Sequence, residues 1–354
     1  MRVFVLTFLM ITSGLYACTD FVITTQDDTV INGRSMEFAV DLEASIRSFP
    51  RGTLVQSEAP NGKPGHSWTS KYGFLGMIVF GLDFSADGIN EKGLSFGALW
   101  LPGTQYQTVD PEDADRAVAI QDVGSWILGN FETVEEVKQA LPTVKIWGNN
   151  VPQLGQVPTL HFSIHDAQGK SIVVEFVDGK VNVYDNPVQV LTNNPTFDWQ
   201  LINLQNFVNL TSLNAKPIDI GAITVNGTGQ GSGLLGIPGD WTPPSRFVRI
   251  AFFKQFVKQP KDGTGGVNLV EHLLNTVDIP YGTVLEGYKK NDTDYTQWAV
   301  VKDLTNRELY YRTYQDLTLN RIDLKKIDFD KGAKTLNLKL STSPTYVDVT
   351  ENMQ

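Results

Sequence analysis

The only cysteine of the chain, Cys18, directly follows an apolar leader, and its position suggests a specific chemistry. Cleavage after Ala17 would make Cys18 the first residue of the mature chain, with a thiol and a free α-amine on one residue. A thiol with a pKa of about 8.5 is mostly protonated at neutral pH, and an amine with a pKa of about 8 can accept its proton. Cys18 is therefore a candidate nucleophile that carries its own base.

A cysteine after a leader can also have a role without catalysis. Bacterial lipoproteins are acylated at such a cysteine, and Leu15 and Ala17 fit the corresponding lipobox, whereas Tyr16 fits it poorly. A third interpretation is a structural thiol without chemistry. The residues around Cys18 leave all three interpretations open, so residues further along the chain must distinguish them.

Residues 1–17 have the composition of a secretory signal peptide. Arg2 precedes an apolar run over residues 3–11, and small and polar residues follow up to Ala17. The run is too short to span a bilayer. We therefore expect an exported protein, periplasmic or secreted, that has no membrane attachment after the signal is cleaved.

The composition of the chain limits its fold and its partners. A single cysteine excludes internal disulfides, so the fold must depend on its core. Hydrophobic residues make up 41% of the chain, which is enough for a large core. The net charge of −10 argues against nucleic acid or an anionic membrane as a partner. A neutral or anionic small substrate would need a local cationic group.

The residues after Cys18 predict a β-hairpin that returns the chain to it. Two β-branched runs flank an aspartate pair at residues 27–28, which is typical of two strands around a turn. Such a hairpin would bring Arg34 and Glu37 close to Cys18. An arginine and a glutamate three residues apart are also common as a solvated pair.

The remaining elements predict one layered α+β domain over residues 18–354. Blocks of strands and helices alternate with no linker-like stretch between them. Strands are expected at residues 76–80, 93–100, 160–165, 171–176, 181–184, 297–301, 308–312 and 335–340. Residues 87–93 are expected to form a turn, and helices are expected at residues 122–131, from 133, from 198 to 208, from 247 to 257 and from 270 to 276.

Two histidines and a glycine-rich run could indicate a metal or a nucleotide, but the sequence favours neither. His161 and His165 share one face of a predicted strand, yet no third ligand lies nearby in the sequence. Residues 231–236 match a dinucleotide-binding fingerprint in letters only, because prolines follow where a helix would have to begin. We therefore expect no metal and no cofactor.

Two later segments contain polar side chains that could serve a reaction. Asn193 and Asn194 end a predicted strand just before a proline, where an amide could donate to a developing oxyanion, although turn chemistry would also select them. Further on, prolines at residues 243 and 244 indicate a helix start. Arg246 would then lie in the first turn of that helix.

Five motifs in order along the chain resemble those of the choloylglycine hydrolase family, which includes bile salt hydrolases and penicillin V acylases. The resemblance extends from Cys18 to about Arg312, through residues 32–37, 86–94, 191–199, 229–233 and 244–247. It implies the fold of an N-terminal-nucleophile hydrolase, a four-layer αββα sandwich of two antiparallel sheets between helical layers. It also implies cleavage before Cys18 and hydrolysis of a linear amide bond.

The resemblance assigns roles to five residues. Cys18 is similar to the family's nucleophile, Arg34 to an electrostatic partner of its thiolate, Asn193 to an oxyanion donor and Arg246 to a second active-site cation. Glu37 stands where bile salt hydrolases usually have an aspartate beside the catalytic amine, so the carboxylate is kept on a longer side chain.

A second departure from the family pattern concerns the substrate. Trp100 stands where bile salt hydrolases have an asparagine, and its backbone N–H could still serve an oxyanion hole. A large aromatic ring there, with Phe38 nearby, favours stacking on a flat or aromatic acyl group. In this respect the chain is similar to penicillin V acylases and acyl-homoserine-lactone acylases of Gram-negative bacteria. Trp100 could instead have an ordinary packing role in the core.

The resemblance thus predicts an amidase acting on a conjugated bile salt, penicillin V or a related N-acyl compound. Within the family, an acyl-homoserine-lactone acylase is the second candidate. Outside this activity, the chain could be a lipoprotein that is acylated on Cys18 and binds small ligands, or a degenerate member that binds amides without cleaving them. Members of the family are commonly tetramers, so a homo-oligomer is expected.

Overall fold

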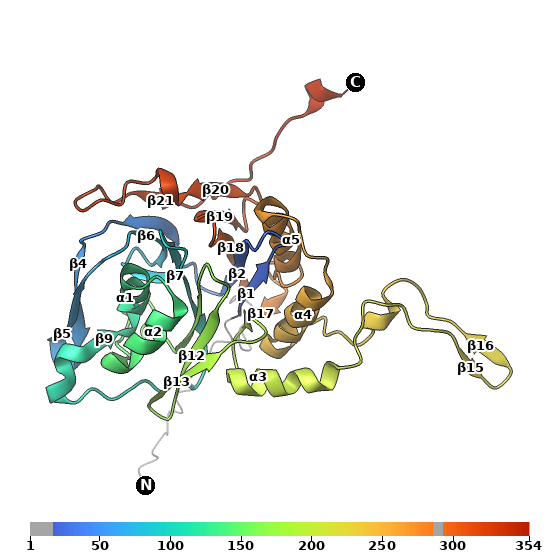
Figure 1. Cartoon of the computed structure of the whole chain (residues 1–354), viewed down its shortest axis with the longest axis horizontal. Coiled ribbons are helices and arrows are strands. Elements are labelled where there is room, and N and C mark those ends of the chain that lie inside the picture. Colours follow the sequence, from blue (N-terminus) through green and yellow to red (C-terminus); the bar gives the residue numbers. More distant parts are fainter. Residues whose placement is uncertain (1–16, 286–292, 354) are drawn as a thin grey trace, which may run out of the picture.

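The computed structural model describes residues 17–285 and 293–353. The predicted signal peptide, residues 1–17, therefore lies outside the described residues except for Ala17. Two large antiparallel sheets face each other, and helices cover their outer surfaces (Figure 1). In the part of the chain described here, no helix is long and apolar enough to cross a membrane.

The first sheet has the strand order β14-β1-β2-β18-β19-β20, and β17 pairs with β18. Its strands are β1 (Cys18–Thr24), β2 (Val30–Phe38), β14 (Val190–Leu191), β17 (Val284–Leu285), β18 (Thr293–Asp303), β19 (Glu308–Thr313) and β20 (Asn320–Asp323).

The second sheet has the order β13-β12-β11-β8-β7-β6-β3-β21. Its strands are β3 (Ser45–Phe49), β6 (Phe74–Val79), β7 (Phe84–Asn90), β8 (Ser95–Trp100), β11 (Leu160–His165), β12 (Ser171–Val177), β13 (Lys180–Asp185) and β21 (Asn337–Lys339). The described residues also form three two-stranded sheets, which pair β4 (Leu54–Ala59) with β5 (Lys63–Thr69), β9 (Ala117–Ala119) with β10 (Lys145–Trp147), and β15 (Ile218–Ile220) with β16 (Ile223–Val225).

The helices form the two outer layers. They are α1 (Val123–Asn130), α2 (Val134–Ala140), α3 (Phe197–Asn203), α4 (Pro243–Phe256) and α5 (Gly263–Asn275). Helix α5 packs on β2 and β18, and α4 packs on β1 and β14, whereas α1 packs on β6, β7 and β8 of the other sheet. This arrangement confirms the predicted α+β sandwich with two antiparallel sheets between helical layers.

The central hairpin of β1 and β2 is two-sided because successive side chains of a strand point to opposite faces. Ile31 and Gly33 of β2 face the helix layer, where Gly33 lies against Val270 of α5. Asp20 and Arg34 face the second sheet instead and lie against Gly97 of β8. One face of the hairpin thus supports the core, and the other lies between the sheets.

The expected turn over residues 87–93 is wrong in its first half. Asp87 to Asn90 belong to β7, which pairs with β8 through Asp87 and Gly97. Asp-Gly and Asn usually indicate turns, but Asp87 is fully buried and ion-paired to residues of other strands. The capping box predicted at Thr133 is present at the start of α2.

Gly33 leaves no room for a larger residue between β2 and α5. A β-carbon built on it would lie 2.4 Å from Val270 Cγ1 and 3.1 Å from Phe21 Cζ. We expect Gly33→Ala to lower the free energy of unfolding by about 1–3 kcal/mol, measured by urea denaturation, because the substitution overpacks the core. The double variant Gly33→Ala/Val270→Ala should lose less than the sum of the two single variants. Gly239→Ala, at an exposed glycine with open space around it, is the control, and additive losses would contradict the prediction.

Candidate active site

Cys18 begins β1 and is buried between the two sheets. It pairs with Met36 of β2, and its Sγ lies 3.6 Å from Met36 Sδ. Only 2% of Cys18 is exposed. The first residue of the predicted mature chain is therefore part of the interior, on the face of the hairpin that also presents Arg34.

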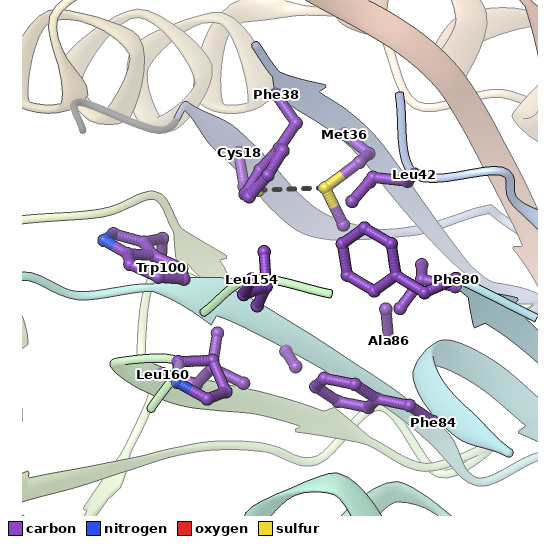
Figure 2. A pocket seen from close by; sticks show the side chains of 13 residues that line it. Cys18, Met36, Phe38, Leu42, Phe80, Phe84, Ala86, Trp100, Leu154 and Leu160 are labelled. Atoms are coloured by element: carbon purple, nitrogen blue, oxygen red, sulfur yellow. Dashed lines mark hydrogen bonds between the residues drawn. The ribbon is translucent and has the colours of Figure 1, made fainter. Parts of the chain in front are cut away.

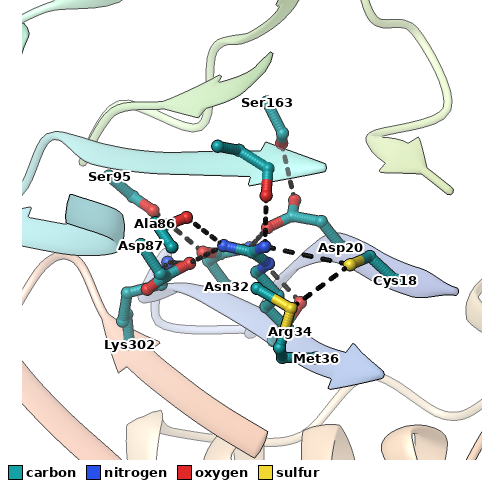
Figure 3. A network of polar contacts seen from close by, with 12 residues as sticks. Cys18, Asp20, Asn32, Arg34, Met36, Ala86, Asp87, Ser95, Ser163 and Lys302 are labelled. Carbon is teal, nitrogen blue, oxygen red and sulfur yellow. Dashed lines mark hydrogen bonds and ion pairs between the residues drawn. The ribbon is translucent and has the colours of Figure 1, made fainter. Parts of the chain in front are cut away.

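The guanidinium of Arg34 lies beside the Cys18 sulfur and is fully buried (Figure 3). Its Nη2 is 4.0 Å from Sγ and donates to the carbonyl oxygen of Ala98, while its Nη1 donates to the carbonyl oxygen of Ala86. Nη1 also forms an ion pair with Asp87 Oδ2 at 3.1 Å. The predicted proximity of Arg34 and Cys18 is thus present in the structure.

A second buried carboxylate, Asp20, lies next to this cluster. It accepts hydrogen bonds from Asn32 at 3.2 Å and from Ser163 at 2.7 Å, and His165 Nε2 is 2.6 Å away. Burial alone would raise the pKa of Asp20, but the attraction of His165 and Lys302 and the hydrogen bonds hold that pKa at about 2. Asp20 is therefore a carboxylate whose charge is already satisfied by its neighbours.

The two histidines of β11 have separate surroundings. His161 lies 3.0 Å from Glu175 and 2.9 Å from the carbonyl oxygen of Thr192, whereas His165 contacts Asp20. Among residues 17–285 and 293–353, no group of three or more His, Cys, Asp or Glu side chains could hold a metal ion.

Asn193 links the Cys18 backbone to Arg246. Its Oδ1 accepts a hydrogen bond from the Cys18 nitrogen and another from Arg246 Nη2, both at 2.7 Å, and its Nδ2 donates to the carbonyl oxygen of Trp100 at 2.8 Å. Arg246 also donates to the Cys18 carbonyl oxygen and to Thr19 Oγ1. These contacts fix the amide group of Asn193 with its nitrogen toward β8.

The Trp100 backbone is directed toward Asn193 as well. In the β8–β11 ladder Trp100 is opposite Leu160, and the next residue, Leu101, donates to the Thr159 carbonyl oxygen at 2.8 Å. Hydrogen-bonded and non-hydrogen-bonded pairs alternate along an antiparallel ladder, so the N–H and C=O of Trp100 point away from β11. The C=O reaches Asn193, and the N–H lies on the same side.

Glu37 lies on the opposite face of β2 from the sulfur. Its Oε1 accepts from Thr296 Oγ1 at 2.8 Å, and its backbone N–H donates to the Ala17 carbonyl oxygen at 3.0 Å, so Glu37 is beside the peptide bond that precedes Cys18. Burial raises the pKa of Glu37 to about 7, although the charge of Arg246 opposes the shift. Its role at a catalytic amine stays a prediction.

The thiol of Cys18 is subject to opposing effects. Burial raises its pKa above the ordinary value, whereas the charges of Arg34 and Arg246 lower it and that of Glu37 raises it. The Cys18 nitrogen is an amide here because Ala17 precedes it. The α-amine that would act as its base forms only when that peptide bond is cleaved.

An apolar pocket opens beside the sulfur (Figure 2). The space between its walls is about 440 Å³, including the open mouth, and the lining comes from both sheets and nearby loops. Phe38 and Trp100 meet edge to face in its wall, with ring centroids 6.2 Å apart. The other lining residues are Cys18, Met36, Leu42, Val79, Phe80, Phe84, Ala86, Ala98, Leu154, Pro158 and Leu160.

Three residues of the site were missed from the sequence. Asp20 lies two residues after Cys18 and therefore shares its face of β1, which the period of a strand could have indicated. Lys302 is a charge inside an apolar strand, and Asp87 was placed in a turn. Both are recognisable only once the strands that bring them together are known.

Two antiparallel sheets between helices, with a buried cysteine at the start of a central strand, define the fold of N-terminal-nucleophile hydrolases. The chain belongs to the choloylglycine hydrolase family of linear amide C–N hydrolases, whose sequence model matches residues 18–337.

Relatives of known function or structure cover nearly the whole chain. A bile salt hydrolase/transferase of Clostridium perfringens is 37% identical over 94% of this chain and 100% of its own length. A penicillin V acylase of Pectobacterium atrosepticum is 29% identical over 94% of this chain and 87% of its own length. The crystal structure of a mutant conjugated bile acid hydrolase from Clostridium perfringens has a TM-score of 0.84 at 34% identity, covering 94% of this chain and 100% of that one.

The expected closeness to Gram-negative members is not confirmed. The structure of a penicillin V acylase from Agrobacterium tumefaciens has a TM-score of 0.74 at 29% identity and covers 91% of each chain, which is below the values for the Clostridium perfringens protein.

The raised pKa of Glu37 predicts a specific pH dependence of stability. Its ordinary value is 4.5 and its value in the folded chain is about 7, so between these pH values the folded state holds a proton that the unfolded state releases. The contribution of Glu37 to stability should therefore fall as pH rises through this window, by on the order of 3 kcal/mol in total.

Urea unfolding of the unaltered chain and of Glu37→Gln between pH 4.5 and 8 measures this difference. Both chains should retain Ala17, so that no amine at Cys18 adds a charge near the carboxyl group. Glu112→Gln, at an exposed carboxylate, controls for the exchange itself. A stability difference that does not change with pH would contradict the prediction.

Proposed function

We propose that the mature chain begins at Cys18 and hydrolyses the amide bond of an N-acyl substrate, with the Cys18 thiolate as the nucleophile. The observation that carries this proposal is the position of Sγ, which lies in the wall of an apolar pocket and 4.0 Å from Arg34 Nη2. Membership of a family of linear amide hydrolases supports the same chemistry.

In the proposed mechanism the α-amine of Cys18 accepts the thiol proton, and the sulfur attacks the amide carbonyl carbon. The oxyanion that forms accepts hydrogen bonds from Asn193 Nδ2 and the Trp100 N–H, which lie on the same side of β8. The C–N bond then breaks, the ammonium of Cys18 gives its proton to the leaving amine, and a thioester remains. Water attacks the thioester, releases the acid and restores the thiol.

The pocket supports an apolar acyl group as the part of the substrate that is bound. Its lining is almost entirely apolar, and the aromatic rings of Phe38 and Trp100, packed edge to face, line it together with Cys18. The names of the relatives mention bile salts and penicillin V. We therefore propose a conjugated bile salt, penicillin V or a related N-acyl compound as substrate, with an acyl-homoserine lactone as the second candidate.

The burial of Cys18 argues against a lipid anchor on this residue. A lipid-anchored cysteine has to lie at the membrane surface, whereas Cys18 is only 2% exposed and begins a strand between the two sheets. Export to the periplasm or out of the cell remains part of the proposal, supported by the composition of residues 1–17. The mass of the mature N-terminus tests cleavage before Cys18 and the absence of a lipid.

We also infer that the protein forms a homo-oligomer, as its family resemblance suggests. The β15–β16 hairpin projects from the body of the molecule (Figure 1). It exposes four apolar side chains, and a two-stranded hairpin alone is only marginally stable in water. A second copy of the chain that covers this hairpin would bury the apolar side chains and stabilise the two strands. The exposed side chains are those of Ile218, Ile220, Ile223 and Val225.

Removing an oxyanion donor tests the proposed function. We expect Asn193→Ala to lower kcat by about two to three orders of magnitude, because each such donor stabilises the transition state by roughly 2.7–4 kcal/mol. The assay measures the amine released from glycine- and taurine-conjugated bile salts, penicillin V and acyl-homoserine lactones. Cys18→Ser, which retains the amine but has a weaker nucleophile, should be nearly inactive. Wild-type turnover in Asn193→Ala would remove this residue from the mechanism.

Replacing Ile220 and Ile223 by serine tests the oligomer. Light scattering after gel filtration should give a multiple of the chain mass for the wild type and a smaller mass for the double variant, because the apolar hairpin surface is lost. A wild-type protein that elutes as a single chain at micromolar concentration would rule the oligomer out.

A further inference from the structure

Lys302 and Asp87 form a buried ion pair that joins the two sheets behind the active site. Lys302 lies in β18 of the first sheet and Asp87 in β7 of the second, and both side chains are fully buried. The Lys302 ammonium donates to both carboxylate oxygens of Asp87, each at 2.7 Å. Desolvation offsets most of the attraction in such a pair, so stability alone is a weak reason for its presence.

The same carboxylate also anchors Arg34. Asp87 Oδ2 lies 3.1 Å from Arg34 Nη1, and Nη2 of the same guanidinium lies 4.0 Å from the Cys18 sulfur (Figure 3). Because a guanidinium is planar and rigid, fixing Nη1 on Asp87 also fixes the direction of Nη2. Four groups therefore follow one another, with Lys302 first, then Asp87, Arg34 and the Cys18 sulfur.

The charges in this series alternate in sign, and they determine how much positive charge acts on a thiolate at Cys18. A lone carboxylate on Arg34 would cancel much of the positive charge that the sulfur experiences, and it would itself repel a thiolate. Lys302 supplies the missing positive charge from the far side of Asp87. Asp20, the other nearby carboxylate, accepts hydrogen bonds from Asn32 and Ser163 and contacts His165. It is also attracted to Lys302 and Arg34, so Lys302 offsets part of its charge as well.

We propose that Asp87 and Lys302 are positioning residues for the nucleophile: Asp87 orients Arg34 toward the Cys18 sulfur, and Lys302 balances the charge of Asp87. The positive charge of Arg34 is then available to stabilise the thiolate. This inference rests on the proposed function in one respect, namely that Cys18 reacts as a thiolate.

Other charged groups also act on the sulfur, so the test must separate them from this pair. Burial lowers the pKa of Lys302, while its attraction to Asp87 opposes that change and favours the charged form. The α-amine of Cys18 is a further charge once the chain is cleaved. The charged or titratable side chains around the sulfur and behind Arg34 are Asp20 of β1, Arg34 and Glu37 of β2, Asp87 of β7, His165 of β11, Arg246 of α4 and Lys302 of β18.

Alkylation of the purified protein by iodoacetamide measures the thiolate directly. Cys18 is the only cysteine in the chain, so the rate as a function of pH reports the pKa of this thiol alone. We expect Lys302→Met to move the profile to higher pH by about one unit, which is about tenfold slower alkylation at neutral pH. Lys302→Arg retains the charge and should retain a profile close to that of the wild type.

Asp87→Asn tests the direction in which the alkylation profile shifts. It removes a negative charge but leaves an amide oxygen that can still accept from Arg34, so the profile should move to lower pH. A pair that only stabilised the fold would not shift the profile in opposite directions when its two members are replaced one at a time. Coincident profiles for Lys302→Met and the wild type, or shifts of Lys302→Met and Asp87→Asn in the same direction, would overturn the proposal.

The double variant Lys302→Met/Asp87→Asn covers the case in which Lys302→Met does not fold. It removes both buried charges together, so no unpaired charge is left in the interior. The net charge of the pair is zero before and after this exchange, so a shift of its alkylation profile reports how Arg34 is held. The neutral amide holds Arg34 less firmly than the carboxylate does, so the profile should move to higher pH by about half a unit, while kcat for amide hydrolysis falls at least about tenfold with little change in KM. An unchanged kcat would contradict the positioning role.

Failure of this inference can be told apart from failure of the proposed function. Alkylation needs no substrate, so shifted profiles in a protein that releases no amine from any substrate would sustain the positioning role and refute the amidase. Amine release together with unshifted alkylation profiles in the variants would sustain the amidase and refute the positioning role.

Discussion

The site depends on one buried positive charge, the Arg34 guanidinium, enclosed between two sheets. Without partners, such a charge would cost several kcal/mol, and its hydrogen bonds must therefore be supplied by the facing sheet. Asp87 and the carbonyl oxygens of Ala86 and Ala98 supply them from β7 and β8. These contacts set how the sheets face each other at the point where the Cys18 sulfur lies.

Cys18 is held from two directions because β1 is covered on both faces. Its side chain contacts Met36 and lies near Arg34 in the space between the sheets. Its backbone is bound from elsewhere, since Arg246 at the start of α4 donates to its carbonyl oxygen and Asn193 accepts from its nitrogen. The sulfur and the nitrogen of one residue thus have separate sets of partners, which suits a residue expected to supply both a nucleophile and a base.

Local signals were enough to predict the elements that carry most of the site. The aspartate pair at residues 27–28 predicted the hairpin of β1 and β2, and the prolines before Arg246 predicted the start of α4; both are present. The position of Glu37 on the face away from the sulfur depends on the register that sets Cys18 opposite Met36. That register follows from the exact geometry of the turn, which the residue types alone do not determine.

The residues that the sequence did not reveal are those whose partners are distant in the chain. Asp87 reads locally as part of an Asp-Gly turn, and only its pairing with Lys302, 215 positions later, explains a carboxylate inside β7. Lys302 is equally uninformative by itself, as a single charge in an apolar strand. Tertiary contacts between the sheets override the local preference in both cases.

The burial of Ala17 bears on the order of events in the life of the protein. Ala17 is 5% exposed, and its carbonyl oxygen is bound by the backbone of Glu37. A peptidase needs accessible residues at the bond it cuts, and the two residues that flank this bond, Ala17 and Cys18, are both buried. Under the proposed maturation, removal of the residues before Cys18 by such an enzyme precedes the closure of β1 into the sheet, and the amine is then present before the fold is complete.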